Sequence, residues 1–167
     1  MRNLRNIYLV GFMGTGKTSV GKALANELRF SFADIDDLIV QQEKRSISNI
    51  FAKDGEPYFR KLEKMALKKV SSKKGQVVSC GGGIILDPEN IKVMKKTGKI
   101  ICLSADPKII LERVKKAKHR PLLNVADPEA MITGLLKKRK ACYAKADFSV
   151  DTSQLTIREV VEKIARF

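Results

Sequence analysis

The sequence predicts an α/β domain in which a parallel β-sheet is covered by helices on both faces. Short apolar runs typical of buried strands alternate along the chain with longer segments in which apolar residues recur at helical spacing. This alternation favours a parallel sheet, because each strand needs a helical crossover before the next strand can run the same way. A glycine-rich loop ending in Gly-Lys-Thr follows the first apolar run and matches a phosphate-binding loop.

Five apolar runs are the predicted strands, and they occupy residues 7–10, 30–33, 76–80, 100–103 and 148–150. The chain of 167 residues is long enough to bury a substantial core, and it contains no repeat, low-complexity segment or interdomain linker. We therefore expect one domain over residues 1–167.

The helices between these runs are predicted from apolar spacing and from proline near the first helical residue. Glu56-Pro57 is expected to open one helix. Asp-Pro pairs at residues 87–88, 106–107 and 127–128 each predict an N-cap followed by proline at the first helical position. A last helix is expected within residues 157–167. The side chains expected to face inward are Val20, Leu24, Leu28, Leu62, Met65, Ala66, Val70, Ile109, Ile110, Val114, Met131, Leu135 and Leu136.

The loop at residues 11–18 fits the pattern G-x-x-x-x-G-K-[ST], in which backbone N–H groups surround the phosphates of a nucleotide. Lys17 supplies a compact cation for the β- and γ-phosphates, and the Thr18 hydroxyl can ligate Mg²⁺. The helix that follows directs its positive end at the same anion. The chain is therefore predicted to bind a nucleoside triphosphate.

The chain is strongly basic, with a net charge of +15. Such a surplus raises the possibility of a nucleic-acid partner. However, the lysines are spread over the predicted helices, and the chain has no Trp and only 6% aromatic residues on which bases could stack. A solvated surface with an anion-attracting site is the favoured interpretation, without a specific nucleic-acid partner.

Hydropathy and cysteine content bear on location. No run approaches the roughly 20 apolar residues that span a bilayer, and the first strand begins too early to leave room for a signal peptide. Cys80, Cys102 and Cys142 are an odd number of cysteines without metal-ligand spacing. We expect free thiols and a cytoplasmic protein without a membrane partner.

Two aspartates follow the second predicted strand, at the edge of a parallel sheet where ligands bind. If the chain is still extended there, Asp34 and Asp36 both face the cleft. One carboxylate would then steady a metal ion or its waters, and the other would accept a hydrogen bond from an attacking hydroxyl. The alternative is that one of them caps a helix that starts near Asp37.

Two further segments leave alternatives open. Gly81, Gly82 and Gly83 follow the third strand, and such a run is costly to order unless the backbone approaches something closely; a flexible turn is the alternative. Residues 115–127 are basic and weakly periodic, which fits either a flap over a phosphate site or an exposed loop.

Taken together, these motifs resemble the shikimate kinase family, and the resemblance covers nearly the whole chain. The family's D-x-D is present as Asp34 and Asp36. Its G-E-x-x-F-R, G-G-G and R-P-L-L patterns match residues 55–60, 81–83 and 120–123, and its R-x-x-x-Y pattern is completed by Arg139 and Tyr143. The sequence departs from the family at positions 40 and 141, where valine and alanine replace the usual acidic residue and proline. Neither position carries a site role.

The resemblance implies a three-layer P-loop kinase fold around a five-stranded parallel sheet. The implied enzyme uses ATP to phosphorylate the 3-hydroxyl of shikimate, giving 3-phosphoshikimate in the chorismate route to aromatic amino acids. It would have a lid near residues 115–127 and a substrate-binding helical region near residues 35–62. Mg²⁺ is the implied cofactor, ATP and shikimate are the implied partners, and a monomer is expected.

The resemblance also implies roles in the transfer itself. Arg60 and Arg139 would hold the substrate carboxylate, which suits a planar bidentate donor. Asp36 would orient or deprotonate the attacking hydroxyl. Lys17 and Arg120 would neutralise the charge that develops on the transferring phosphoryl group.

The remaining implied roles concern the metal, the ring and the nucleotide. Thr18 and Asp34 would hold Mg²⁺, Gly82 would offer its backbone to the ring, and Arg113 would pack against adenine. The implied catalytic residues are Asp36, Lys17 and Arg120. The implied ATP-binding residues are Gly14, Thr15, Gly16, Lys17, Thr18, Ser19, Arg113 and Arg120, and the substrate-binding residues are Asp36, Arg60, Gly81, Gly82, Gly83 and Arg139.

Other functions remain as alternatives. Another small polyol-acid kinase, such as a gluconate kinase, would suit a similar cleft, and the basic charge would also fit an RNA-binding NTPase. The F-R, G-G-G and R-x-x-x-Y set favours shikimate.

Overall fold

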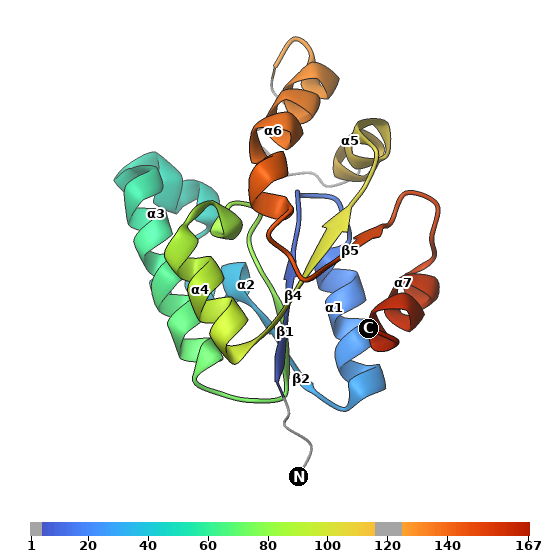
Figure 1. The fold of residues 1–167 in the computed structure, drawn as a ribbon. Coiled ribbons are helices and arrows are strands. Elements are labelled where there is room, and N and C mark those ends of the chain that lie inside the picture. The colour runs from blue at the N-terminus through green and yellow to red at the C-terminus, as the bar shows by residue number, and fades with distance from the viewer. Residues whose placement is uncertain (1–4, 116–124) are drawn as a thin grey trace.

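The computed structural model describes residues 5–115 and 125–167. At its centre lies a five-stranded sheet with the order β2-β3-β1-β4-β5 (Figure 1). All four strand pairings are parallel, which confirms the predicted fold class. The strands are β1 (Asn6–Val10), β2 (Ser31–Asp34), β3 (Gln76–Ser79), β4 (Gly98–Ser104) and β5 (Phe148–Asp151).

Helices cover both faces of the sheet and its carboxyl-terminal edge. They are α1 (Lys17–Leu28), α2 (Ile35–Glu43), α3 (Ile47–Ser71), α4 (Pro88–Thr97), α5 (Pro107–Lys115), α6 (Pro128–Tyr143) and α7 (Ile157–Ala165), with a short 3₁₀ helix, η1 (Ile84–Leu86). Figure 1 shows α3 and α4 on one side of the sheet, α1 and α7 on the other, and α5 and α6 beyond the strand ends. The three predicted layers are therefore present.

Alternation along the strands divides the core between the two faces. On β1, Tyr8 packs with α3 and α4, whereas Leu9 packs with α1 and α7. A third apolar cluster joins Phe12 to Ile110 of α5 and Ile132 of α6, beyond the strand ends. The central strand is buried on both faces, as a parallel sheet requires.

The three Asp-Pro pairs begin helices as predicted. The Asp87 carboxylate accepts a hydrogen bond from the Glu89 amide at 2.8 Å, and Asp127 accepts one from the Ala130 amide at 2.9 Å. Asp106 does the same for the Lys108 amide at 2.9 Å.

Glu56-Pro57 opens a helix as predicted, but α3 also has an earlier helical part that was not predicted. This part begins at Ile47, and a kink at Gly55 (φ 78°, ψ 176°) separates it from the part that starts at Glu56. One predicted inward position in the second part is wrong. Met65, predicted to face inward, is 49% exposed. The buried stripe follows Leu62, Ala66 and Val70 at intervals of four, which leaves Met65 at the edge of the helix face.

The cysteines and hydropathy agree with the sequence analysis. Cys80 and Cys102 are buried, and all three cysteines are free thiols. Burial raises the pKa of the Cys102 thiol to about 11, which disfavours the thiolate. In the described part of the chain, no helix is both long and apolar enough to cross a bilayer.

Candidate active site

A cavity of about 760 Å³ opens at the carboxyl-terminal edge of the sheet. Its walls come from the glycine-rich loop, the ends of β2 and β3, the kinked helix α3, and one side chain of α6. The predicted site residues that line it are Gly14, Gly16, Lys17, Asp34, Asp36, Arg60, Gly81, Gly82, Gly83 and Arg139. Residues that lie far apart in the sequence thus share one cleft.

The glycine-rich loop wraps tightly against the end of β4. Gly11 has φ 140°, and a Cβ there would collide with the backbone carbonyl of Leu103, so only glycine fits. The Lys17 ammonium donates to the carbonyls of Gly11 and Phe12, both at 2.9 Å. This places the cation over the loop in which phosphates would bind.

A set of oxygen ligands lies beside this loop. The Thr18 hydroxyl donates to Asp34 Oδ2 at 3.0 Å, and Ser79 Oγ lies 3.5 Å from the same hydroxyl. Among the described residues there is no group of three or more His, Cys, Asp or Glu side chains placed to hold a metal ion. A site with only a few protein oxygens beside a phosphate loop is suitable for Mg²⁺, because this ion keeps several waters and takes other ligands from the nucleotide.

The chain is extended at Asp34, the last residue of β2, but not at Asp36, so the expectation of an extended segment across both aspartates is wrong. Helix α2 begins at Ile35, and Asp34 is its N-cap, because its Oδ1 accepts from the Asp36 amide at 3.0 Å. The capping alternative therefore holds for Asp34. Asp36 lies in the first turn of α2 and still lines the cavity.

Arg60 is held by two carboxylates on its own helix. Its Nη1 donates to Glu63 Oε2 at 2.9 Å, and its Nε and Nη2 donate to Glu56 Oε1 at 3.1 and 2.9 Å. Glu63 is only 1% exposed. Burial raises the pKa of the Glu63 carboxyl above its ordinary value, and the adjacent Arg60 guanidinium opposes that rise.

Glu63 is not among the site residues predicted from the sequence. Its signal was available, because Glu63 follows Arg60 by three residues on a helix and stands between the inward-facing Leu62 and Ala66.

Charged side chains lie close to two of the three glycines that follow β3. A Cβ at Gly83 would lie 2.5 Å from Arg60 Nη1, and one at Gly81 would lie 2.7 Å from Glu63 Oε1. At Gly82 the nearest atom to such a Cβ is 3.5 Å away. The turn is also hydrogen-bonded into η1, since the Ile84 amide donates to the Gly81 carbonyl. Close approach therefore explains Gly81 and Gly83 better than a flexible turn does.

Helix α6 reaches the cleft through Arg139 and is joined to the glycine turn by Arg139 and Tyr143. Both side chains donate to the Gly82 carbonyl, Arg139 Nη1 at 3.3 Å and Tyr143 Oη at 3.0 Å. The Arg139 guanidinium also lies 5.6 Å from the ring centre of Phe12. The Gly82 peptide is thus anchored to the same helix that brings Arg139 into the cavity.

Three other predicted nucleotide-binding residues, Thr15, Ser19 and Arg113, are not among the residues that line the cavity. Thr15 is fully buried, and Ser19 is exposed in the first turn of α1. Arg113 Nη1 donates to the Gly14 carbonyl at 3.2 Å, so it touches the back of the loop. Arg120 and most of the predicted lid lie outside the described residues.

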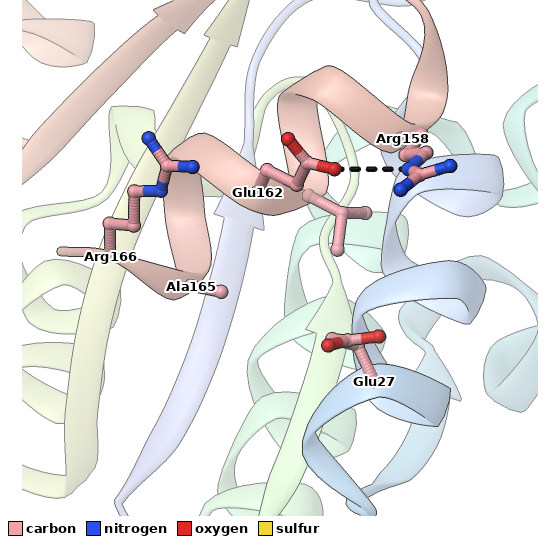
Figure 2. A pocket seen from close by; sticks show the side chains of 6 residues that line it. Glu27, Arg158, Glu162, Ala165 and Arg166 are labelled. Atoms are coloured by element: carbon pink, nitrogen blue, oxygen red, sulfur yellow. Dashed lines mark hydrogen bonds and ion pairs between the residues drawn. The ribbon is translucent and has the colours of Figure 1, made fainter.

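A second hollow of about 430 Å³ lies between α1 and α7 (Figure 2). Its walls carry both signs of charge, and Arg158 is already paired with Glu162 at 3.0 Å. Glu27 places it at the end of α1 opposite to Lys17, and no predicted site residue lines it. The cleft at the strand ends is therefore the candidate active site.

Comparison with known proteins bears on this cleft. A family model described as shikimate kinase matches residues 13–167. A shikimate kinase of Thermodesulfovibrio yellowstonii is 50% identical over 98% of this chain and 94% of its own length. One from Caldanaerobacter subterraneus is 49% identical over 98% of this chain and 95% of its own length.

Solved structures agree with the sequence comparison. Shikimate kinase from Acinetobacter baumannii in complex with shikimate superposes with a TM-score of 0.92 at 38% identity, covering 98% of this chain and 92% of that one. A gluconokinase from Sinorhizobium meliloti superposes with a TM-score of 0.59 at 16% identity, covering 99% of this chain and 94% of that one. That second likeness shows a shared fold alone.

Proposed function

The chain belongs to the shikimate kinase family, and from that premise we propose how its cleft carries out the reaction. The enzyme phosphorylates the 3-hydroxyl of shikimate with ATP, giving ADP and 3-phosphoshikimate. One observation carries the assignment of roles: a single cavity joins a phosphate-binding loop to an aspartate and two arginines. Such a cavity can bind a triphosphate at one end and a hydroxylated carboxylic acid at the other.

Arg60 and Arg139 bind the substrate carboxylate. They reach the cleft from α3 and α6, and each is held in place by contacts with the protein, Arg60 by Glu63 and Arg139 by the Gly82 carbonyl. Planar guanidinium groups that are already oriented lose little freedom when they take up a carboxylate.

Asp36 accepts a hydrogen bond from the hydroxyl that attacks the γ-phosphate. It lies in the first turn of α2, close to the Gly81 end of the glycine turn, where a Cβ would be 3.2 Å from its Oδ1. Its carboxylate can orient the hydroxyl and take its proton as the new bond forms.

Lys17 neutralises the phosphoryl oxygens, and the backbone amides of residues 14–19 hold the β- and γ-phosphates. The lid near residues 115–127, Arg120 within it and the contact of Arg113 with adenine belong to the same proposal. So do the substrate-binding region near residues 35–62, the monomeric state and the cytoplasmic location.

Thr18 and Asp34 would hold Mg²⁺, Thr18 directly and Asp34 through a bound water. The ion would supply positive charge that offsets the charge of the phosphates. Because Asp34 also caps α2, the metal position is tied to the helix that carries Asp36.

One coupled assay tests the function. ADP release is measured with shikimate, gluconate, RNA or water as acceptor. We expect rapid turnover with shikimate alone, and loss of that turnover when EDTA removes the divalent cation. A rate with gluconate or RNA equal to that with shikimate would contradict the assignment.

The Gly83→Ala variant is expected to raise the KM for shikimate by about tenfold and to change the KM for ATP little. The new Cβ would displace the Arg60 guanidinium, which lies against Gly83. Gly134→Ala is the matched control, because a Cβ at Gly134 on α6 would meet nothing within 4 Å. Steady-state kinetics check the prediction, and equal KM values for the two variants would contradict it.

A further inference from the structure

Thr152 is a buried polar residue that has no part in the function proposed above. It is 3% exposed and follows directly after β5. Its amide donates to the Ser104 carbonyl at the end of β4, at 2.8 Å. This bond holds Thr152 at the end of β4, next to the phosphate-binding loop.

The Thr152 hydroxyl makes three polar contacts there. It accepts a hydrogen bond from Arg113 Nη1 at 3.0 Å, and it lies 3.1 Å from the carbonyl oxygens of both Thr15 and Ser104. The Ser104 carbonyl already accepts the Thr152 amide. The single hydroxyl proton can therefore serve the Thr15 carbonyl in the loop.

Arg113 completes this support. Its Nη2 donates to the Thr152 carbonyl at 2.8 Å, and its Nη1 also donates to the Gly14 carbonyl at 3.2 Å. Two successive carbonyls of the loop, those of Gly14 and Thr15, thus point outward to Arg113 and Thr152.

The direction of a carbonyl fixes the direction of the next amide. In a trans peptide the C=O and N–H bonds point to opposite sides. With the Thr15 carbonyl held toward Thr152, the Gly16 N–H points the other way, and Gly16 lines the cavity. Loop amides aimed in this way form the anion-binding concavity of a phosphate loop.

We propose that Thr152 is a positioning residue for the nucleotide: its hydroxyl holds the Thr15–Gly16 peptide so that the Gly16 amide meets a phosphate. The inference rests on the proposed function, since it takes ATP to be the ligand of this loop. It predicts an effect on nucleotide binding and none on the acceptor, because the hydrogen bonds of Thr152 go to the phosphate-binding loop, Arg113 and Ser104 and not to the residues proposed to bind the acceptor.

The test compares two substitutions that separate the shape of the Thr152 side chain from its hydroxyl group. Thr152→Val keeps the shape and loses the hydroxyl, whereas Thr152→Ser keeps the hydroxyl. We expect Thr152→Val to weaken ADP binding, measured by calorimetry, and to raise the KM for ATP, each by about tenfold. Thr152→Ser should stay within about twofold of the wild type, and the KM for shikimate should hold in both variants.

Thr133→Val is the matched control, because the exposed Thr133 hydroxyl donates to a carbonyl of its own helix α6 and touches no part of the loop. If the valine variant does not fold, Thr152→Ala, which adds no buried methyl against the carbonyls, carries the same expectation. Wild-type ADP affinity in a folded variant without the hydroxyl would overturn the proposal. Equal rises in the KM for ATP and the KM for shikimate would also overturn it. So would weak ADP binding in Thr152→Ser, which keeps the hydroxyl.

The calorimetric measurement separates this proposal from the proposed function. A wild-type enzyme that binds ADP but transfers no phosphate to shikimate would refute the function. The comparison of the Thr152 variants for ADP binding would still decide the role of Thr152.

Discussion

Replacing Asp36 with asparagine is expected to lower kcat by about a thousandfold, the range typical of a lost general base, while the dissociation constant for ATP changes little. Asparagine has the same shape but no negative charge, so it can neither take the proton of the attacking hydroxyl nor attract it strongly. Asp36 lines the cavity beside the glycine turn, so its loss acts on the acceptor and not on the nucleotide.

Asp37→Asn provides a close control for this substitution. Asp37 is the next residue, lies in the same first turn of α2 and is exposed, so it shares the helix-terminal environment of Asp36 without lining the cavity. Steady-state phosphorylation and calorimetric titration with ATP check both variants. A kcat near that of the wild type in Asp36→Asn would exclude Asp36 from the chemical step.

Much of the fold was predictable because it depends on local patterns. The five apolar runs became the five strands within a few residues. For β1, β3 and β4, which lie inside the sheet, the reason is that a strand covered on both faces needs an apolar stretch. The Asp-Pro pairs became helix starts because the capping carboxylate and the fixed proline backbone act within one turn.

The D-x-D motif shows where local patterns compete. An extended strand would place Asp34 and Asp36 on one side, but the Asp34 carboxylate satisfies the free amides at the start of α2. Capping removes the cost of unpaired N–H groups, so the helix begins one residue after Asp34. Both aspartates still reach the cleft, although by a different geometry.

Ser79 and Thr152 could not have been identified in advance. The contacts of each lie at least 39 residues away in the sequence, Thr18 for Ser79 and Arg113, Ser104 and Thr15 for Thr152. These contacts exist because β3 and β4 lie on either side of β1 and β5 lies beside β4. No spacing in the sequence encodes that order.

Replacing Arg60 with alanine is expected to raise the KM for shikimate by about a hundredfold, as the loss of charge-assisted hydrogen bonds to a carboxylate implies. The KM for ATP should change little. The same substitution leaves Glu63 buried without its guanidinium partner, since Glu63 is 1% exposed and paired with Arg60 at 2.9 Å. We therefore expect the variant also to lose about 3–5 kcal/mol of unfolding free energy near neutral pH.

This loss of stability has a definite pH dependence. The pKa of Glu63 in the folded protein is already raised above its ordinary value by burial, and Arg60 opposes that rise. A carboxyl with a raised folded pKa favours folding while it is protonated, and this stability is lost as the pH rises through the folded pKa. Without Arg60 the pKa of Glu63 rises further. Denaturant unfolding at about pH 5 and about pH 8 should therefore show the larger deficit of Arg60→Ala at the higher pH.

A second substitution separates the two roles of Arg60. Adding Glu63→Gln to Arg60→Ala removes the buried charge, so the double variant should recover most of the lost stability and lose its pH dependence. Its KM for shikimate should stay high, because glutamine replaces no donor for the substrate carboxylate. If the KM recovered together with the stability, the effect of Arg60 on shikimate would be an indirect result of misfolding. If only the stability recovered, Arg60 would bind the substrate while Glu63 holds the Arg60 side chain in place. The buried carboxylate of Glu63 would then be stabilised in the core by the same arginine that it orients.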